Sequence, residues 1–407
     1  MKVIFNKYNQ SIMLFFLWLW TVGLFTVDKF RVLSSISMIG FSVIGLLSAP
    51  PKYWFKNYYN NKSFFALGVS FFILFPSYLY STNTDYLCKK VLLLLPYFVL
   101  PFTYVQIKPF NKDHIQIIIN TFCIGVIITA VQALIYYYNN ASEVNQAYLE
   151  SRVMPTAVAH HPTFSLMCAL AIYFLYYNFK NAETLKYQII NAVGAVLLVV
   201  FIHIFSVRAG LLAFYLLMLL AIYEQVIIYK KIKLVVAMVL VCLTVAGLTF
   251  AFSPTIRNKI ANTQNDIDNY QSGKSVNNQS LGSRIISYKN AIEIASNTSV
   301  LFGCGLGDIE DLNNQLFATK YPEVSKRIIP HNQFLFYYAA IGLLGVFIFI
   351  LAFYFPLYKN FSNLHLVAQY IVVTVAFLIE AFLTTQLGVS FSLLFLLLFI
   401  NNKQASL

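Results

Sequence analysis

A histidine stands where a polar segment enters a long apolar run, in the stretch PHNQFLFYYAAIGLLG at residues 330–345. His331 follows a proline and precedes Asn332, whose side chain either orients the imidazole or caps a helix that begins there. A neutral imidazole near pH 7 has the form that a general base requires. Histidines also occur at such entrances as ordinary interfacial residues. His331 is therefore a candidate general base whose role depends on the groups that face it.

Two arginines are candidates for binding an anion. Arg208 lies in FSVRAGLLAF, on a connection between apolar runs that is too short to be a free loop. Its guanidinium either extends toward lipid headgroups or pairs with phosphate oxygens. Arg284 opens the segment SRIISYKNAIEIASN (283–297), and the N-terminus of a helix favours anions. Each could also be a solvated charge, but on the same side of a membrane the two would form a cationic pocket.

Other ionisable residues give weaker signals. His161, which a proline follows, is a supporting candidate together with Asn332. Glu380 is interpreted as the only carboxylate inside a membrane span, where it pairs with an arginine, stays protonated or couples to an ion. Single, scattered cysteines and the lack of paired acids predict no metal site, and no cofactor is expected. In LFGCGLGDIEDLNN (301–314), the glycines are expected to shape a loop and not to grip phosphate.

The composition determines which elements must hold these residues. Of the 407 residues, 59% are hydrophobic and 11% are charged, and the mean hydropathy is +0.69. Such values lie outside the range of soluble domains, and runs of about 20 apolar residues recur along the chain. The fold class is therefore all-α, a polytopic membrane protein with about 12 transmembrane helices. The predicted spans are 11–28, 31–49, 63–80, 86–105, 115–138, 161–178, 187–206, 208–229, 232–252, 331–356, 365–386 and 388–402.

Three of these boundaries rest on short interruptions. The seventh and eighth spans are separated only by Ser206, Val207 and Arg208, and the last two spans are alternatively one re-entrant pair around residues 386–388. The first span lacks a small-residue cleavage site and is interpreted as a retained helix. Gly342 and Gly345 are expected to let a neighbouring helix pack closely.

The basic residues indicate an orientation. The formal charge of +13 is distributed by topology, which argues against nucleic acid as a partner. With the N-terminus inside, alternate inner loops carry fourteen lysines, and the short outer loops carry six lysines and arginines. This bias predicts that both termini are cytoplasmic.

The predicted domains follow from this orientation. Residues 1–252 hold membrane helices 1–9, residues 253–330 form a long outward-facing loop between the ninth and tenth spans, and residues 331–407 hold helices 10–12. In the loop, residues 262–280 are rich in Asn, Gln, Ser and Asp and are expected to be exposed to solvent. Residues 283–297 are expected to form an amphipathic helix on the membrane domain.

The order of these motifs resembles the O-antigen ligase and polymerase superfamily. SVRAG lies between spans, SRIISYKNAIEIASN and FGCGLGD follow in the outer loop, and HNQFLFYYAAIGLLG opens the next span. HPTFSLMCALA (161–171) also looks like a His-Pro-Thr segment of some members. The resemblance covers residues 200–350 by motif and the whole chain by topology.

The resemblance implies an inverting, metal-independent glycosyl transfer at the periplasmic face of the cytoplasmic (inner) membrane. The donor would be a glycan on undecaprenyl diphosphate, and the acceptor lipid A-core for a ligase or a growing lipid-linked glycan for a polymerase. By position, Arg208 and Arg284 match the arginines that hold the donor diphosphate, and His331 matches the base.

Two alternatives to a ligase remain at this stage. A polymerase uses the same donor, so the sequence does not separate it from a ligase. A transporter of lipid-linked glycans would be favoured by broken helices and paired charges within the membrane. The large outer loop with clustered arginines and a histidine at a helix mouth favours the transferase.

Overall fold

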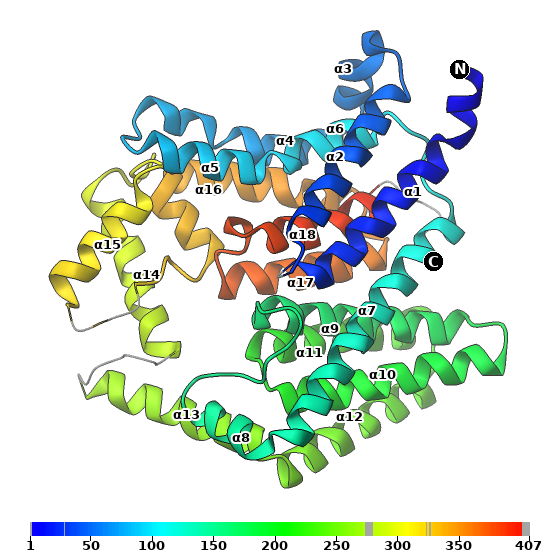
Figure 1. Ribbon diagram of the computed structural model, residues 1–407, viewed down its shortest axis with the longest axis vertical. Coiled ribbons are helices and arrows are strands. Elements are labelled where there is room, and N and C mark those ends of the chain that lie inside the picture. The colour runs from blue at the N-terminus through cyan, green and yellow to red at the C-terminus, as the bar shows by residue number, and fades with distance from the viewer. Residues whose placement is uncertain (1, 28, 273–279, 323, 325–326, 401–407) are drawn as a thin grey trace. The chain divides into compact units, whose positions relative to one another are not determined.

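The structure is a computed structural model that describes residues 2–27, 29–272, 280–322, 324 and 327–400 (Figure 1). Residues 273–279 of the predicted polar stretch and residues 401–402 of the last predicted span lie outside this part of the chain. In chain order the helices are α1 (Lys2–Thr26), α2 (Val32–Leu47), α3 (Pro51–Asn60), α4 (Lys62–Phe72), η1 (Phe75–Leu79), α5 (Thr84–Leu94), α6 (Pro96–Tyr104), α7 (Lys112–Asn139), α8 (Ala141–Leu149), α9 (His161–Asn181), α10 (Leu185–Phe205), α11 (Arg208–Tyr223), η2 (Glu224–Ile228), α12 (Ile232–Phe252), α13 (Pro254–Gln271), α14 (Ser280–Asn297), α15 (Ile309–Lys320), α16 (Gln333–Lys359), α17 (Leu364–Ile379), η3 (Phe382–Thr384) and α18 (Gln386–Phe399).

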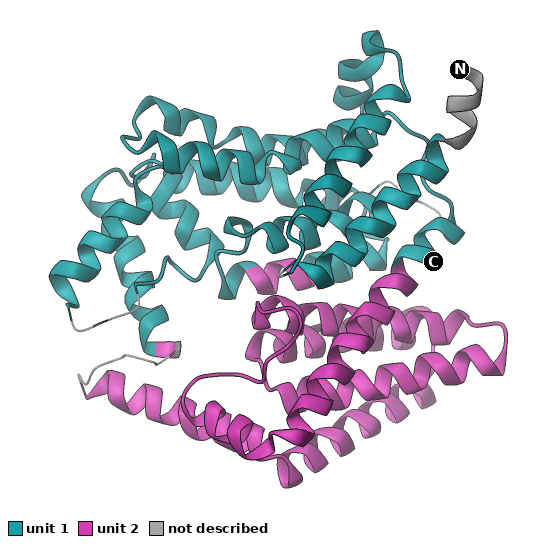
Figure 2. Cartoon of the chain, in the orientation of Figure 1, with its two compact units in different colours: residues 1–118, 282–370, 377–407 teal, residues 119–281, 371–376 magenta. Residues whose placement is uncertain are grey.

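The chain forms two compact units that interleave along the sequence (Figure 2). Unit 1 consists of residues 1–118, 282–370 and 377–407, and unit 2 consists of residues 119–281 and 371–376. Arg284, His331 and Glu380 therefore belong to unit 1, whereas Arg208 and His161 belong to unit 2.

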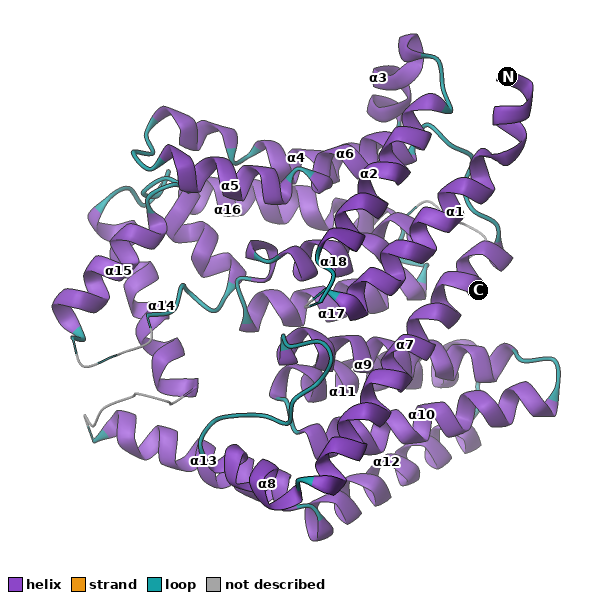
Figure 3. Ribbon diagram, in the orientation of Figure 1, coloured by secondary structure: helices purple, strands orange, loops and turns teal. Residues whose placement is uncertain are grey.

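The regular elements of the described residues are all helices (Figure 3), which confirms the all-α prediction. Each of the twelve predicted spans coincides with one helix or with two consecutive helices. Nine helices in the described part of the chain are long and apolar enough to cross a membrane, and the pair α2 and α3, bent by 107°, adds a tenth if counted as one span. The other two predicted spans are the apolar helices α17 and α18, of 16 and 14 residues, which are shorter than the roughly 20 residues that a simple span needs. The chain is therefore a multi-pass membrane protein.

The core of unit 1 contains α18. A helix that is apolar on all sides belongs in the interior of a bundle, and α18 is buried from Leu387 to Phe399. It packs against α1, α5 and α6. Its few polar groups are satisfied locally, because the hydroxyls of Ser392 and Tyr97 lie 2.7 Å apart. This buried helix gives α6 a rigid neighbour, and α4 in turn packs on α6 and on α16.

Unit 2 is built around α9, which packs against α10 and α11. Of its membrane window 72% is buried, against 11% for α12, so α12 lies at the edge of this unit. The predicted break between the seventh and eighth spans is confirmed. Helix α10 ends at Phe205, Ser206 takes a left-handed conformation with φ 49°, and α11 begins at Arg208.

The polar segment after α12 differs from the prediction. Residues 254–271 form the helix α13, in which Gln264, Asn265, Asp268 and Gln271 are exposed as expected, whereas Asn262 and Asp266 are buried. The reason is that its amides bind the helix α8. The Asn258 side chain donates to the Asn145 carbonyl at 2.8 Å, and the Asn262 side chain donates to the Leu149 carbonyl at 2.8 Å. By contrast, the helix predicted at residues 283–297 is confirmed as α14.

Candidate active site

His331 stands directly before the first turn of α16. Asn332 is the N-cap of this helix, and its side-chain oxygen accepts hydrogen bonds from the Phe334 and Leu335 amides at 2.9 and 3.0 Å. Its amide nitrogen donates to the Leu378 carbonyl at the end of α17, at 3.1 Å. Of the two roles predicted for Asn332, the structure therefore shows the cap. This cap fixes the chain beside His331 and joins the entrance of α16 to α17.

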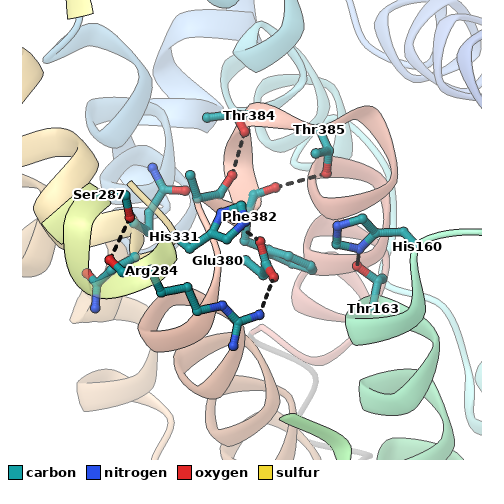
Figure 4. A network of polar contacts seen from close by, with 12 residues as sticks. His160, Thr163, Arg284, Ser287, His331, Glu380, Phe382, Thr384 and Thr385 are labelled. Carbon is teal, nitrogen blue, oxygen red and sulfur yellow. Dashed lines mark hydrogen bonds and ion pairs between the residues drawn. The ribbon is translucent and has the colours of Figure 1, made fainter. Parts of the chain in front are cut away.

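Glu380 brings two of the predicted site residues together (Figure 4). It lies one residue past the end of α17, in the turn before η3. One carboxylate oxygen accepts from the Arg284 guanidinium at 3.2 Å, and the other lies 3.3 Å from Nδ1 of His331. The pairing of Glu380 with an arginine is thus confirmed. All three side chains keep some exposure, at 22% for Arg284, 27% for His331 and 11% for Glu380.

Helix α14 contributes a second contact to His331. Tyr288 follows Arg284 by four residues, which places both on one face of the helix. The Tyr288 hydroxyl donates to the His331 carbonyl at 2.9 Å. Burial, opposed by the charge of Arg284 and reinforced by that of Glu380, raises the pKa of Tyr288 above its ordinary value. The phenol therefore stays protonated at neutral pH and remains a donor to the backbone of His331.

The helix that carries His331 is broken at Gly342. This residue has φ 69° and ψ −177°, a conformation outside the helical region that glycine adopts without the Cβ penalty of other residues. Backbone groups of residues 300–305, here called the insert, pair with the opened turn. The Cys304 and Gly305 amides donate to the Ala339 and Ala340 carbonyls, both at 2.9 Å, and the Leu343 amide donates to the Val300 carbonyl at 2.8 Å.

The glycines of the insert allow this close approach. Gly303 and Gly305 have φ of 72° and 98°, and a Cβ added at Gly303 would lie 2.6 Å from the Ala340 carbonyl carbon. This confirms that the glycines shape the loop. The expectation that Gly342 lets a neighbouring helix pack closely is wrong, because the backbone of a loop, at Leu301 and Phe302, lies against it.

Asp308, to which the sequence assigned no role, anchors the other side of the insert. Its carboxylate accepts from the Thr82 amide at 2.9 Å, the Thr82 hydroxyl at 2.9 Å and the Asn83 amide at 2.7 Å. These residues lie between η1 and α5. Because backbone amides and a hydroxyl satisfy the charge, Asp308 fixes the turn that connects α14 with α15. A short acid directly after a glycine-rich turn is a weak sequence signal for such an anchor.

Arg208 and His161 occupy helix starts in unit 2. Arg208 is the first residue of α11, is half-buried, and donates to the Thr263 hydroxyl on α13. His161 is the first residue of α9, and its ring makes an edge contact with the Phe205 ring at 6.0 Å between centroids. The convergence of Arg208 with Arg284 and His331 stays a prediction.

Glu380 is not the only acid within the predicted spans. Glu224 lies in η2, inside the candidate span Arg208–Ile228, and its side chain is 1% exposed. Lys180 of α9 lies 2.6 Å from one of its oxygens, and the Tyr176 hydroxyl donates to the other at 2.9 Å. The expectation that Glu380 is the only carboxylate within a membrane span is therefore wrong. A carboxylate is tolerated within an apolar run when a buried ammonium and a hydroxyl satisfy it.

The comparisons with known proteins agree with the motifs. Residues 193–350 match the family model described as O-Antigen ligase. This match places the segment in the O-antigen ligase superfamily and confirms the resemblance. The matched segment contains Arg208, Arg284 and His331. A search of curated proteins gives no match. In the described part of the chain, no group of three or more His, Cys, Asp or Glu side chains is placed to hold a metal ion.

Proposed function

We propose that this protein is an O-antigen ligase-type glycosyltransferase, which moves a glycan from undecaprenyl diphosphate to lipid A-core at the outer face of the cytoplasmic membrane. The observation that supports this most is the pair of contacts at Glu380, which bring Arg284 and His331 to one carboxylate at 3.2 and 3.3 Å. A transfer from a diphosphate needs a cation at the leaving group and a base at the acceptor hydroxyl. The family match supports the same class of reaction.

In the proposed reaction, the acceptor hydroxyl loses its proton to His331 while its oxygen attacks the anomeric carbon of the donor sugar. The bond between that carbon and the diphosphate oxygen breaks, and the electron pair leaves with undecaprenyl diphosphate. Attack from the face opposite the leaving group inverts the anomeric configuration. Fixed guanidinium groups stabilise the negative charge that develops on the diphosphate, so this charge needs no metal ion.

Glu380 has a positioning role in this scheme. Nδ1 is the imidazole nitrogen that faces its carboxylate, so a proton on Nδ1 would make Nε2 the nitrogen that accepts the proton of the hydroxyl. The hydrogen bond from Tyr288 to the His331 carbonyl fixes the backbone. Glu380 thereby orients the imidazole ring of His331, and Tyr288 fixes its main chain.

Arg284 would bind the donor diphosphate together with Arg208. A guanidinium has five N–H donors in a planar fork, so Arg284 can contact Glu380 and phosphate oxygens at the same time. Glu380 holds it in place but neutralises part of its charge, and a second arginine would restore the net positive charge of the pocket. His161, at the start of α9, is proposed as a supporting residue.

The orientation belongs to the same proposal. The excess of basic residues on alternate loops supports cytoplasmic termini and a periplasmic location of residues 253–330. The three predicted domains, 1–252, 253–330 and 331–407, follow from it. The glycan would then lie under α14 and the insert, and the polyprenyl chain would remain in the lipid.

An in vitro transfer assay tests the proposal. Purified protein is mixed with undecaprenyl-diphosphate-linked glycan and lipid A-core in the presence of EDTA. We expect transfer by the wild type and a loss of about 10²- to 10⁴-fold in His331→Ala, the range for removal of a general base. His114→Ala, a half-buried histidine at the start of α7, is the matched control and should retain wild-type activity.

The same assay includes the two arginines. Arg208→Ala and Arg284→Ala, alone and combined, should be non-additive if both contact one diphosphate. Unchanged transfer by His331→Ala would refute the proposed base. Chain elongation on lipid-linked glycan alone, with no transfer to the core, would make the protein a polymerase.

A further inference from the structure

A polar cavity of about 660 Å³ opens in unit 1 at the end of α16 that is remote from His331. After its break at Gly342, helix α16 continues over residues 343–359, which corresponds to about 25 Å of helix. With the predicted orientation, in which the residues before α4 and after α16 are cytoplasmic, the cavity lies at the opposite membrane face from the candidate active site. Its lining residues come from α3, the start of α4, the end of α6 and the end of α16: Asn57, Asn60, Asn61, Lys62, Ser63, Val105, Lys359 and Asn360.

The charge of this cavity is positive and is not balanced by the helices around it. Its lining contains two lysines and no acid. The sequences of α3, α4 and α16 contain no aspartate or glutamate, although α3 adds Lys52 and Lys56. Lys62 and Lys359 instead contact aromatic rings, with the Lys62 ammonium 3.4 Å from the Tyr59 ring centroid. A positive field without a nearby carboxylate attracts an anion from outside the protein.

The polar side chains of the lining hold its walls together. The Asn360 amide donates to the Ser63 hydroxyl at 3.4 Å and to the Pro356 carbonyl at 2.9 Å, which joins the end of α16 to the start of α4. Asn57 donates to the Gln106 side chain at 2.9 Å and joins α3 to the residues after α6. The cavity also includes the first residues of α4, whose backbone N–H groups favour an anion.

Helix α3 places this cavity at the level of lipid headgroups. It is bent by 107° from α2, too sharply to continue the same straight span. Its sequence, PKYWFKNYYN, combines two lysines with several aromatic residues, and Phe55 and Tyr59 are 73% and 60% exposed. Exposed aromatic rings together with lysines are typical of helices that lie in the interface between membrane and water.

We propose that this cavity binds the phosphate-bearing headgroup of an anionic phospholipid. The Lys62 and Lys359 ammonium groups pair with the phosphate, and the asparagine amides bind the polar part of the headgroup. With the orientation proposed above, the lipid comes from the cytoplasmic leaflet, whose negative surface potential favours such a site. The site does not take part in glycosyl transfer. It anchors α3, α4 and α16 to the leaflet opposite the candidate active site.

Native mass spectrometry of the purified full chain tests this inference. The protein in detergent is titrated with phosphatidylglycerol and, in parallel, with phosphatidylcholine. We expect one phosphatidylglycerol to be retained in preference to phosphatidylcholine, and about 30-fold weaker retention in Lys62→Gln/Lys359→Gln. Lys62→Arg/Lys359→Arg keeps the charge and should keep the lipid.

The matched control is Lys230→Gln/Lys231→Gln, which removes two exposed lysines of unit 2 on the same predicted membrane side. An equal loss in this control would show a general charge effect and would overturn the site. Displacement of the lipid by millimolar inorganic phosphate would overturn the lipid as the ligand and indicate a free anion. Full retention by the double glutamine variant would also refute the proposal. All of these experiments measure lipid binding and not glycosyl transfer. A failure of the lipid-site proposal is therefore distinguishable from a failure of the proposed function.

Discussion

Two buried carboxylates, one in each unit, have different surroundings. Glu224 in unit 2 has Lys180 at 2.6 Å and the Tyr176 hydroxyl at 2.9 Å, and its side chain is 1% exposed. Glu380 in unit 1 has Arg284 at 3.2 Å and His331 at 3.3 Å, and its side chain is 11% exposed. Both are acids within apolar sequence, but the charged partner of Glu224 is 9% exposed, whereas those of Glu380 are 22% and 27% exposed.

The difference separates a structural ion pair from a site that is able to bind a further molecule. Lys180 is 9% exposed, and its ammonium is taken up by Glu224 and by the Tyr229 ring, whose centroid lies 4.3 Å away. Such a closed pair contributes to folding mainly because its loss leaves an uncompensated charge. Arg284 and His331 keep about a quarter of their surface exposed. Under the proposed function, the carboxylate between them would orient a cation and a base that solvent reaches, as catalysis requires.

The largest effect is expected from breaking the closed pair. Glu224→Ala leaves the Lys180 ammonium buried without its partner, so the free energy of unfolding should fall by about 3–5 kcal/mol. Thermal unfolding in detergent measures this. The double variant Glu224→Leu/Lys180→Met should recover most of the loss, because apolar side chains of similar size replace the pair. Little change in Glu224→Ala would contradict the description of this pair as closed.

Glu380→Gln tests the cluster of Arg284, His331 and Glu380. This substitution should reduce the rate of the reaction more than the stability of the protein. The amide keeps the shape of the side chain but loses the charge shared by Arg284 and His331. Loss of a charge-assisted hydrogen bond predicts a fall in kcat of about 10- to 100-fold. Glu380→Asp should recover part of it. A loss of stability as large as that of Glu224→Ala, with kcat unchanged in the folded protein, would remove the distinction between the two carboxylates.

The sequence was sufficient for the elements that depend on hydropathy and local chemistry. Runs of apolar residues located the helices, Asn332 indicated a cap, and the spacing of Ile285, Ile286 and Ile294 indicated α14. For Glu380 the sequence indicated pairing with an arginine, protonation or coupling to an ion, because an unpaired charge in a membrane is costly. It did not specify which arginine, since Arg284 is 96 residues away and pairing at that distance depends on the fold.

Features that depend on contacts between distant backbone segments were missed. Residues 333–359 form one apolar run, so the break at Gly342 has no hydropathy signal. It exists because the insert satisfies the amides and carbonyls that the break exposes. Glu224 was overlooked for a related reason, because Lys180 lies 44 residues earlier and at the edge of its own span.

The smallest expected effect concerns the insert, residues 300–305, which packs on the helix that His331 precedes. We expect the insert to be as inaccessible to solvent as the Glu224 pair. Cys304 in the insert is 8% exposed, and burial, reinforced by Asp308, raises the pKa of its thiol to about 12. Because a raised pKa favours the protonated form, roughly one thiol in 10⁴ is ionised at pH 8. In a Cys88→Ser background, which removes the exposed cysteine, maleimide should label Cys304 slowly at this pH.

Gly342→Ala should make the Cys304 thiol more accessible to maleimide. An added Cβ would overlap the Leu301 carbonyl and would force a non-glycine residue to φ 69°, at a cost of about 1–3 kcal/mol. The insert should then leave the break more often, and labelling of Cys304 should become faster. Gly247→Ala is the matched control, since a Cβ at this position in α12 meets nothing within 4 Å. Labelling of Gly342→Ala at the wild-type rate would mean that the insert does not depend on the break, and that the mouth of α16 is held by Asn332 and Glu380 alone.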